Sequence, residues 1–154
     1  NPFESGPTFE AFLKHYSHNG LILNCKTEGI EAKILKLLKS YGVNDFFFLD
    51  LSVPFLIKTY KSGCRKIAAR FSEHEPLEFA KKFKEKCEWV WIDSFSGEYF
   101  EAMDLMVLSK FFKICIVSPE IRGFDLEIIQ SLKTRYDGIN IDAVCTKNPE
   151  LWKS

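Results

Sequence analysis

The sequence predicts an α/β fold with parallel strands, on the basis of three observations. Six short apolar runs rich in β-branched and aromatic residues recur along the chain, and stretches with helical periodicity separate them. Strands that alternate with helices pair in parallel through right-handed crossovers. Apolar residues occupy consecutive positions, which suits a sheet covered on both faces. The expected strands are 21–26, 45–50, 66–70, 89–93, 113–118 and 141–146.

The expected helices in the first half of the chain each have a start or stop signal. Thr8 can cap a short helix over residues 9–16. After the first strand, an apolar stripe at helical spacing predicts a helix that ends at Gly42. The stripe consists of Ile30, Ile34, Leu37, Leu38 and Tyr41. The connection 52–63 is short and is opened by Pro54.

The second half of the sequence predicts three further helices. Pro76 opens residues 76–87, where Phe79 and Phe83 are four positions apart and share one face. Residues 97–112 place Phe100, Met103, Val107 and Phe111 at similar spacing, which predicts a common apolar face. Residues 125–135 are expected to bury Leu126, Ile129 and Leu132.

Length, composition and charge predict one globular domain over residues 1–154. Hydrophobic residues make up 46% of the chain and charged ones 27%, and Lys+Arg and Asp+Glu both number 21. This balance gives no global field toward nucleic acid or an anionic membrane, and no apolar run is long enough to predict a membrane span. The start at Asn1, followed by polar residues, indicates no targeting peptide and suggests a fragment or a processed chain.

Five cysteines form no CxxC pair, and three of them lie in apolar runs. Thiols in such positions behave as small hydrophobes, so a reducing, cytoplasmic location is expected. His15 and His18 share a helix face but lack a metal-binding framework. The sequence contains no GxGxxG, P-loop or GxSxG motif.

Each expected strand closes with a polar side chain, at intervals of 20 to 28 residues: Lys26, Asp50, Arg70, Asp93, Ser118 and Thr146. The carboxyl ends of parallel strands are where α/β proteins bind ligands, so we expect the six ends to converge on one anion-sized pocket. Lys26 and Arg70 suit a phosphate or carboxylate. Asp50 and Asp93 can hold substrate hydroxyls, orient a cation, or pair with Lys26 and Arg70.

Beyond Arg70, the segment 71–76 has two interpretations. Glu73 and Glu75 can reach the same mouth as Arg70. Ser72 and Glu75 also match a capping box for the helix opened by Pro76, and this second interpretation is favoured.

Two segments point to a known family. Residues 24–26 read Asn-Cys-Lys where that family has Glu-x-Lys, and residues 142–149 read Asp-Ala-Val-Cys-Thr-Lys-Asn-Pro against Asp-Gly-x-x-Thr-Asp-x-Pro. With the order of the intervening strands, the chain resembles the glycerophosphodiester phosphodiesterase-like family, relatives of phosphatidylinositol-specific phospholipase C. The resemblance implies an incomplete (β/α)8 TIM barrel of about six strands, strands three to eight, because a complete barrel needs about 250 residues. The alternative is an open doubly wound sheet.

The resemblance also implies which functional residues the chain has and which it lacks. The family's His-Arg strand, its Glu-x-Asp strand and its second His-Asp segment have no counterpart, so no catalytic residue is expected in this segment. Lys26, Arg70, Asp50 and Asp93 would bind substrate and phosphate. Asn24 stands at the place of a metal-binding carboxylate, and its carbonyl can ligate Mg²⁺ or Ca²⁺.

The leading expectation is therefore part of a phosphoric diester hydrolase that acts on glycerophosphodiester-like substrates, with this chain as the phosphate- and substrate-binding wall. The alternatives are a non-catalytic phosphate-ligand binding module of the same fold and a stand-alone α/β interaction domain. The missing barrel strands would come from upstream sequence or from a partner chain, with a homodimer as one such arrangement, because unpaired strand edges expose backbone donors and acceptors.

Overall fold

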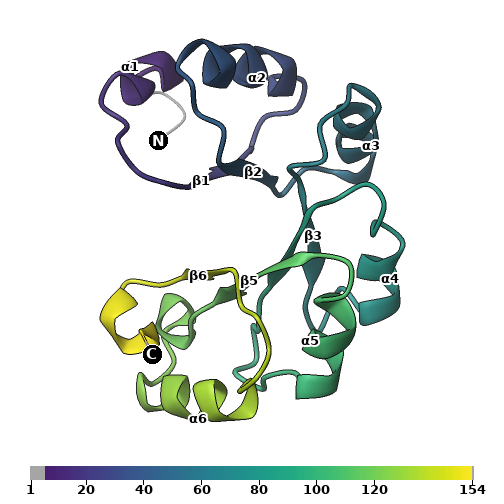
Figure 1. Cartoon of the computed structure of the whole chain (residues 1–154), viewed down its shortest axis with the longest axis vertical. Coiled ribbons are helices and arrows are strands. Elements are labelled where there is room, and N and C mark those ends of the chain that lie inside the picture. The colour runs from purple at the N-terminus through teal and green to yellow at the C-terminus, as the bar shows by residue number, and fades with distance from the viewer. Residues whose placement is uncertain (1–5, 154) are drawn as a thin grey trace. The chain divides into compact units, whose positions relative to one another are not determined.

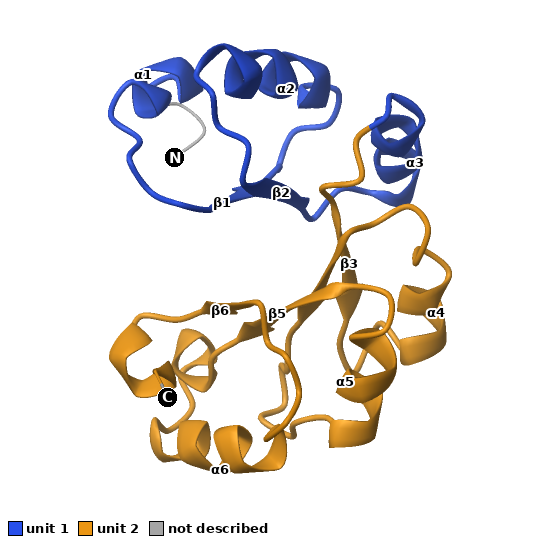
Figure 2. Ribbon diagram, in the orientation of Figure 1, with its two compact units in different colours: residues 1–63 blue, residues 64–154 orange. Residues whose placement is uncertain are grey.

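The computed structural model describes residues 6–153 and has the predicted α/β class (Figure 1). The described strands form two parallel sheets, one with the order β1-β2 and one with the order β3-β4-β5-β6. The chain divides into two compact units, Asn1–Gly63 and Cys64–Ser154 (Figure 2). All six expected strands are present and parallel; the barrel implied by the resemblance stays a prediction.

The first unit contains three helices and two strands. Its elements are α1 Phe9–Leu13, β1 Leu21–Asn24, α2 Glu31–Ser40, β2 Phe46–Leu49 and α3 Val53–Lys61. The predicted cap is confirmed, because the Thr8 hydroxyl accepts a hydrogen bond from the Ala11 amide at 3.1 Å. Ile34 and Leu38 of α2 are buried, and Gly42 follows the helix with a φ of 69°. That left-handed conformation favours glycine and explains why the helix ends there.

The second unit alternates strands and helices. Its elements are β3 Ala68–Phe71, α4 Leu77–Lys81, β4 Trp89–Ile92, α5 Ala102–Leu108, β5 Lys113–Val117, the 3-10 helix η1 Pro119–Arg122, α6 Glu127–Arg135, β6 Ala143–Cys145 and the 3-10 helix η2 Pro149–Trp152. Pairing is in register from Ala68 opposite Trp89 to Val117 opposite Cys145. The two central strands, β4 and β5, are buried along almost their whole length. The apolar runs are therefore explained by burial on both faces.

One predicted helix face is wrong, and a second is wrong only at Leu126, because Ile129 and Leu132 of α6 are buried as predicted. Met103 is 66% exposed, whereas Leu105 and Leu108 of α5 are completely buried. The helix begins only at Ala102, so the helical spacing counted from Phe100 crosses residues that are not helical. Leu126 is exposed because it is the N-cap of α6 rather than part of its buried face. In addition, α4 covers five residues of the expected 76–87.

None of the five cysteines forms a disulfide. Cys87 and Cys115 are buried, which confirms the hydrophobic role for Cys115. Burial raises the pKa of the Cys87 thiol to about 12. In the part of the chain that the structure describes, no helix has both the length and the hydropathy needed to cross a membrane.

Candidate functional site

The candidate site lies at the carboxyl edge of the four-stranded sheet. Arg70 belongs to β3, Asp93 follows β4, Ser118 follows β5 and Thr146 follows β6. Because these strands are parallel and in register, their ends meet at one edge. Within this unit, the structure thus brings together the four strand ends that the sequence predicted.

Asp93 is the centre of the site and is only 1% exposed. Arg122 donates from Nε to Asp93 Oδ1 at 3.0 Å and from Nη2 to Oδ2. Arg70 donates from Nη2 to Oδ2 at 3.5 Å, and the Trp91 indole donates to the same oxygen at 3.4 Å. One buried carboxylate therefore holds two guanidinium groups beside each other, in the pairing that a buried charge requires.

Glu75 is the second carboxylate that holds the Arg70 guanidinium. Arg70 Nε donates to Glu75 Oε2 at 2.9 Å, and the Ser72 hydroxyl donates to the same oxygen at 2.7 Å. The favoured capping-box interpretation is wrong, because Pro76 is the N-cap of α4. The Ser72 and Glu75 backbones instead bond to each other in both directions at 3.1 Å and close a tight turn, which directs Glu75 back toward Arg70.

Glu73 braces the loop that follows Asp93. Its carboxylate accepts bonds from the Phe95 and Ser96 amides at 3.0 Å and from the Ser94 and Ser96 hydroxyls at 2.9 and 2.6 Å. Burial by itself raises the pKa of Glu73, but these hydrogen bonds outweigh it and lower the pKa to about 2. The loop after β4 is consequently fixed by a carboxylate from the loop after β3.

Glu120 connects the ends of β5 and β6 in the same way. It accepts hydrogen bonds from the Ser118 and Thr146 hydroxyls and from the Lys147 amide at 2.9 Å. Burial raises its pKa, and these bonds lower it to about 2. The Trp152 indole donates to the Ser118 hydroxyl at 2.8 Å. Ser118 and Thr146 therefore have structural partners at the edge of the site.

An aromatic ring lies against Arg122. The Arg122 guanidinium carbon is 4.3 Å from the centroid of the Phe95 ring, and Phe95 is 41% exposed. The His74 ring lies 5.9 Å from that of Phe95. A cation over an aromatic face is stabilised by the ring quadrupole. Arg122 and Phe95 had no predicted role, because their contacts depend on how separate loops meet.

The first unit contains a second, smaller cluster at the ends of β1 and β2. Asn24 Nδ2 and Lys26 Nζ both donate to Asp50 Oδ2, at 2.9 and 3.0 Å. Asp50 adopts a φ of 61°, which is uncommon for a residue other than glycine and is found at functional turns. The structure thus joins Lys26 to Asp50 and Arg70 to Asp93; the convergence of all six strand ends on one pocket stays a prediction.

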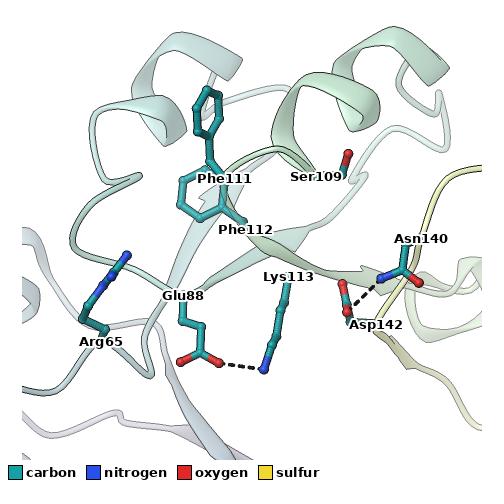
Figure 3. Close-up of a pocket in the computed structure, with 8 residues that line it drawn as sticks. All are labelled: Arg65, Glu88, Ser109, Phe111, Phe112, Lys113, Asn140 and Asp142. Atoms are coloured by element: carbon teal, nitrogen blue, oxygen red, sulfur yellow. Dashed lines mark hydrogen bonds and ion pairs between the residues drawn. The ribbon is translucent and has the colours of Figure 1, made fainter.

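A pocket of about 400 Å³ lies at the opposite edge of the four-stranded sheet (Figure 3). Lys113 donates to Glu88 at 2.8 Å, and Asp142 accepts from the Ile114 amide at 2.8 Å and from Asn140 at 3.0 Å. These contacts link the amino ends of neighbouring strands, where polar residues usually serve stability rather than ligand binding. The residues that line this pocket are Arg65, Glu88, Ser109, Phe111, Phe112, Lys113, Asn140 and Asp142.

Within residues 6–153, no group of three or more His, Cys, Asp or Glu side chains is arranged to hold a metal ion. The proposed metal role of Asn24 therefore has no carboxylate cluster around it and stays a prediction.

The comparisons with known proteins give no match: no family model, no curated protein and no solved structure matches the chain.

Proposed function

We propose that the unit of residues 64–154 binds a small ligand through its phosphate group, at the carboxyl edge of the four-stranded sheet. One observation carries the proposal: buried Asp93 holds the guanidinium groups of Arg70 and Arg122 at the carboxyl edge of the sheet. A guanidinium presents five N–H donors in a planar fork that matches phosphate oxygens. Two such groups, fixed before the ligand arrives, lower the ordering cost of binding.

The exposure of the two arginines supports a ligand-binding role. The Arg70 side chain is 23% exposed and that of Arg122 36%, so both reach solvent although their carboxylate partner does not. The Phe95 ring, whose backbone amide is bonded to Glu73, lies against the Arg122 guanidinium. A ligand phosphate would thus meet donors whose positions are set by the surrounding fold.

The binding proposal is tested by thermal unfolding of the full chain with glycerol 3-phosphate. We expect millimolar ligand to raise the Tm, since a ligand that binds only the folded state stabilises it. Arg122→Gln and Arg70→Gln should each lower the affinity for glycerol 3-phosphate, obtained from the Tm at a series of ligand concentrations, at least tenfold, as expected for loss of a charged hydrogen-bond partner. Arg65→Gln, at the opposite edge, is the control with the same charge change. Absence of a Tm shift, or an equal loss in all three variants, would reject the proposal.

A second candidate function is the substrate-holding wall of a phosphoric diester hydrolase that acts on glycerophosphodiester-like substrates. The Asn24–Asp50–Lys26 cluster favours it, because the two residues at the Glu-x-Lys position share one carboxylate partner. In this proposal, Lys26 and Asp50 contact substrate, Asn24 ligates Mg²⁺ or Ca²⁺, and histidines outside this sequence transfer protons.

The second candidate is tested by titrating glycerophosphocholine with and without Mg²⁺. We expect Mg²⁺ to strengthen binding, and Asn24→Asp to strengthen it further because a carboxylate binds the cation better than an amide. Asn140→Asp, at the opposite edge of the other sheet, controls for the added charge. Binding that is independent of Mg²⁺ in every variant would remove the cation from this proposal.

A further inference from the structure

The rings of Phe95 and His74 lie beside the proposed phosphate site and reach solvent. Phe95 belongs to the loop that follows β4 and is 41% exposed, and His74 belongs to the turn that follows β3 and is also exposed. The two ring centroids are 5.9 Å apart, and the ring planes make an angle of 37°. The Arg122 guanidinium carbon lies 4.3 Å from the Phe95 centroid. An arginine of the phosphate site is therefore in contact with an aromatic surface that is open to solvent.

Hydrogen bonds to the Glu73 carboxylate fix the two rings relative to each other. Glu73 directly precedes His74, and its carboxylate accepts from the Phe95 and Ser96 amides, each at 3.0 Å. The His74 amide donates to the Ser72 hydroxyl at 3.2 Å, within the closed turn. The backbone that carries each ring is thus held in place, so little conformational entropy is lost when a ligand stacks there.

The charge around the two arginines indicates that the ligand has more than a phosphate group. The same edge of the sheet holds the carboxylates of Asp93, Glu75, Glu73 and Glu120. Burial raises the pKa of both Glu73 and Glu120, but their hydrogen bonds lower it to about 2, so both are charged at neutral pH. A phosphate meets N–H donors here without an excess of positive charge, so further affinity has to come from an uncharged contact. The exposed Phe95 ring offers that contact.

We propose that the ligand of this site is a nucleoside monophosphate whose base stacks on Phe95 and His74. Its phosphate meets the two arginines, so the inference rests on the proposed phosphate site and specifies what the phosphate carries. A nucleobase is planar and uncharged, and it stacks on an aromatic side chain without requiring a particular hydrogen-bond pattern. Arg122 extends the stacking surface, because a guanidinium plane also stacks on bases.

The test compares adenosine 5′-monophosphate with ribose 5-phosphate, which is the same sugar phosphate without the base. The affinities of the full chain for both ligands are obtained from the Tm at a series of ligand concentrations. We expect adenosine 5′-monophosphate to bind about fivefold more tightly or better, as stacking on one aromatic side chain provides. Equal affinities would overturn the inference and leave the phosphate site in place. Binding of neither ligand would reject the phosphate site itself and the inference with it.

Variants of Phe95 locate the base. Phe95→Leu keeps an apolar side chain without the aromatic face, and should lower the affinity for adenosine 5′-monophosphate about threefold or more beyond its effect on ribose 5-phosphate. If Phe95 only supported the fold, both affinities would fall equally, which would overturn the inference. Phe95→Tyr keeps the ring and should retain the preference for adenosine 5′-monophosphate.

Phe111→Leu is the matched control at the opposite edge of the same sheet. Phe111 is 39% exposed, and the Lys84 ammonium lies 5.2 Å from its ring centroid, so it has a similar exposure and a similar cation contact. We expect this variant to keep the preference for adenosine 5′-monophosphate. Loss of the preference in Phe111→Leu, or its persistence in Phe95→Leu, would overturn the placement of the base on Phe95.

Discussion

Asp93→Asn is the substitution that tests the organisation of the phosphate site most directly. It preserves the shape of the side chain but removes the charge that three guanidinium N–H groups contact. Hydrogen bonds to a charged group contribute about 1.5–3 kcal/mol each. The variant does not lose all of this free energy, because the amide that replaces the carboxylate keeps one acceptor oxygen and because both arginines reach water. We therefore expect the free energy of unfolding to fall by about 2–4 kcal/mol.

The assay is urea unfolding, with thermal unfolding as a second measure. In a chain of about 150 residues, 1 kcal/mol corresponds to about 2–4 °C in Tm, so Tm should fall by roughly 4–16 °C. Asp125→Asn removes the same charge from an exposed position and should change stability by less than about 0.5 kcal/mol. If Asp93→Asn is as mild as this control, Asp93 does not hold the two arginines and the reasoning fails.

Three further predictions concern the surroundings of the site. Gly97→Ala should cost at least about 1 kcal/mol more than Gly138→Ala in urea unfolding: both glycines have positive φ, but only at position 97 would the new Cβ stand 3.0 Å from Phe124. Equal costs would contradict this. Glu73→Gln should flatten the dependence of the free energy of unfolding on pH between about 4.5 and 2. The pKa of Glu73 is lowered to about 2, so its carboxylate stabilises the fold fully above the ordinary pKa of 4.5, and this stabilisation is lost as the pH falls toward 2. If the variant keeps the same pH dependence, the Glu73 carboxylate is not held as described. Glu75→Gln should raise the affinity for glycerol 3-phosphate several-fold, since it removes a negative charge beside the binding donors, and a loss of affinity in the same titration would mean that Glu75 supports the ligand.

The sequence predicted the strands well because their burial leaves a direct pattern. Residues such as Val90 and Ile114 are completely buried, and a strand covered on both faces requires an unbroken apolar run. Arg70 and Asp93 could be predicted as neighbours for the same reason, since each marks the end of such a run and the strands are parallel. Their position follows from topology alone.

The partners of these residues could not be predicted in the same way. Arg122 stands in a 3-10 turn after β5, and nothing in its local sequence indicates that it reaches the end of β4. Ser72 and Glu75 have the spacing of a capping box, yet the intervening turn closes before the helix begins. The stripe that includes Met103 failed because α5 carries a second apolar pair, Leu105 and Leu108, and tertiary packing buries that pair instead. Loop geometry decides the contacts of Arg122 and Ser72, and loop geometry depends on tertiary packing.

The charge balance of the site determines how an anion would be recognised there. Arg70 and Arg122 are matched by the carboxylates of Asp93 and Glu75, and Glu73 and Glu120 at the same edge add two further carboxylates, so these six side chains carry a net charge of −2. Such a cluster provides no long-range attraction for an anion, so diffusional steering does not favour binding. Affinity would instead come from N–H donors in contact with the ligand, whose strength depends on their fixed orientation. The buried position of Asp93 is therefore the feature on which binding depends, because the same carboxylate that cancels a positive charge also sets the direction in which the two guanidinium groups point.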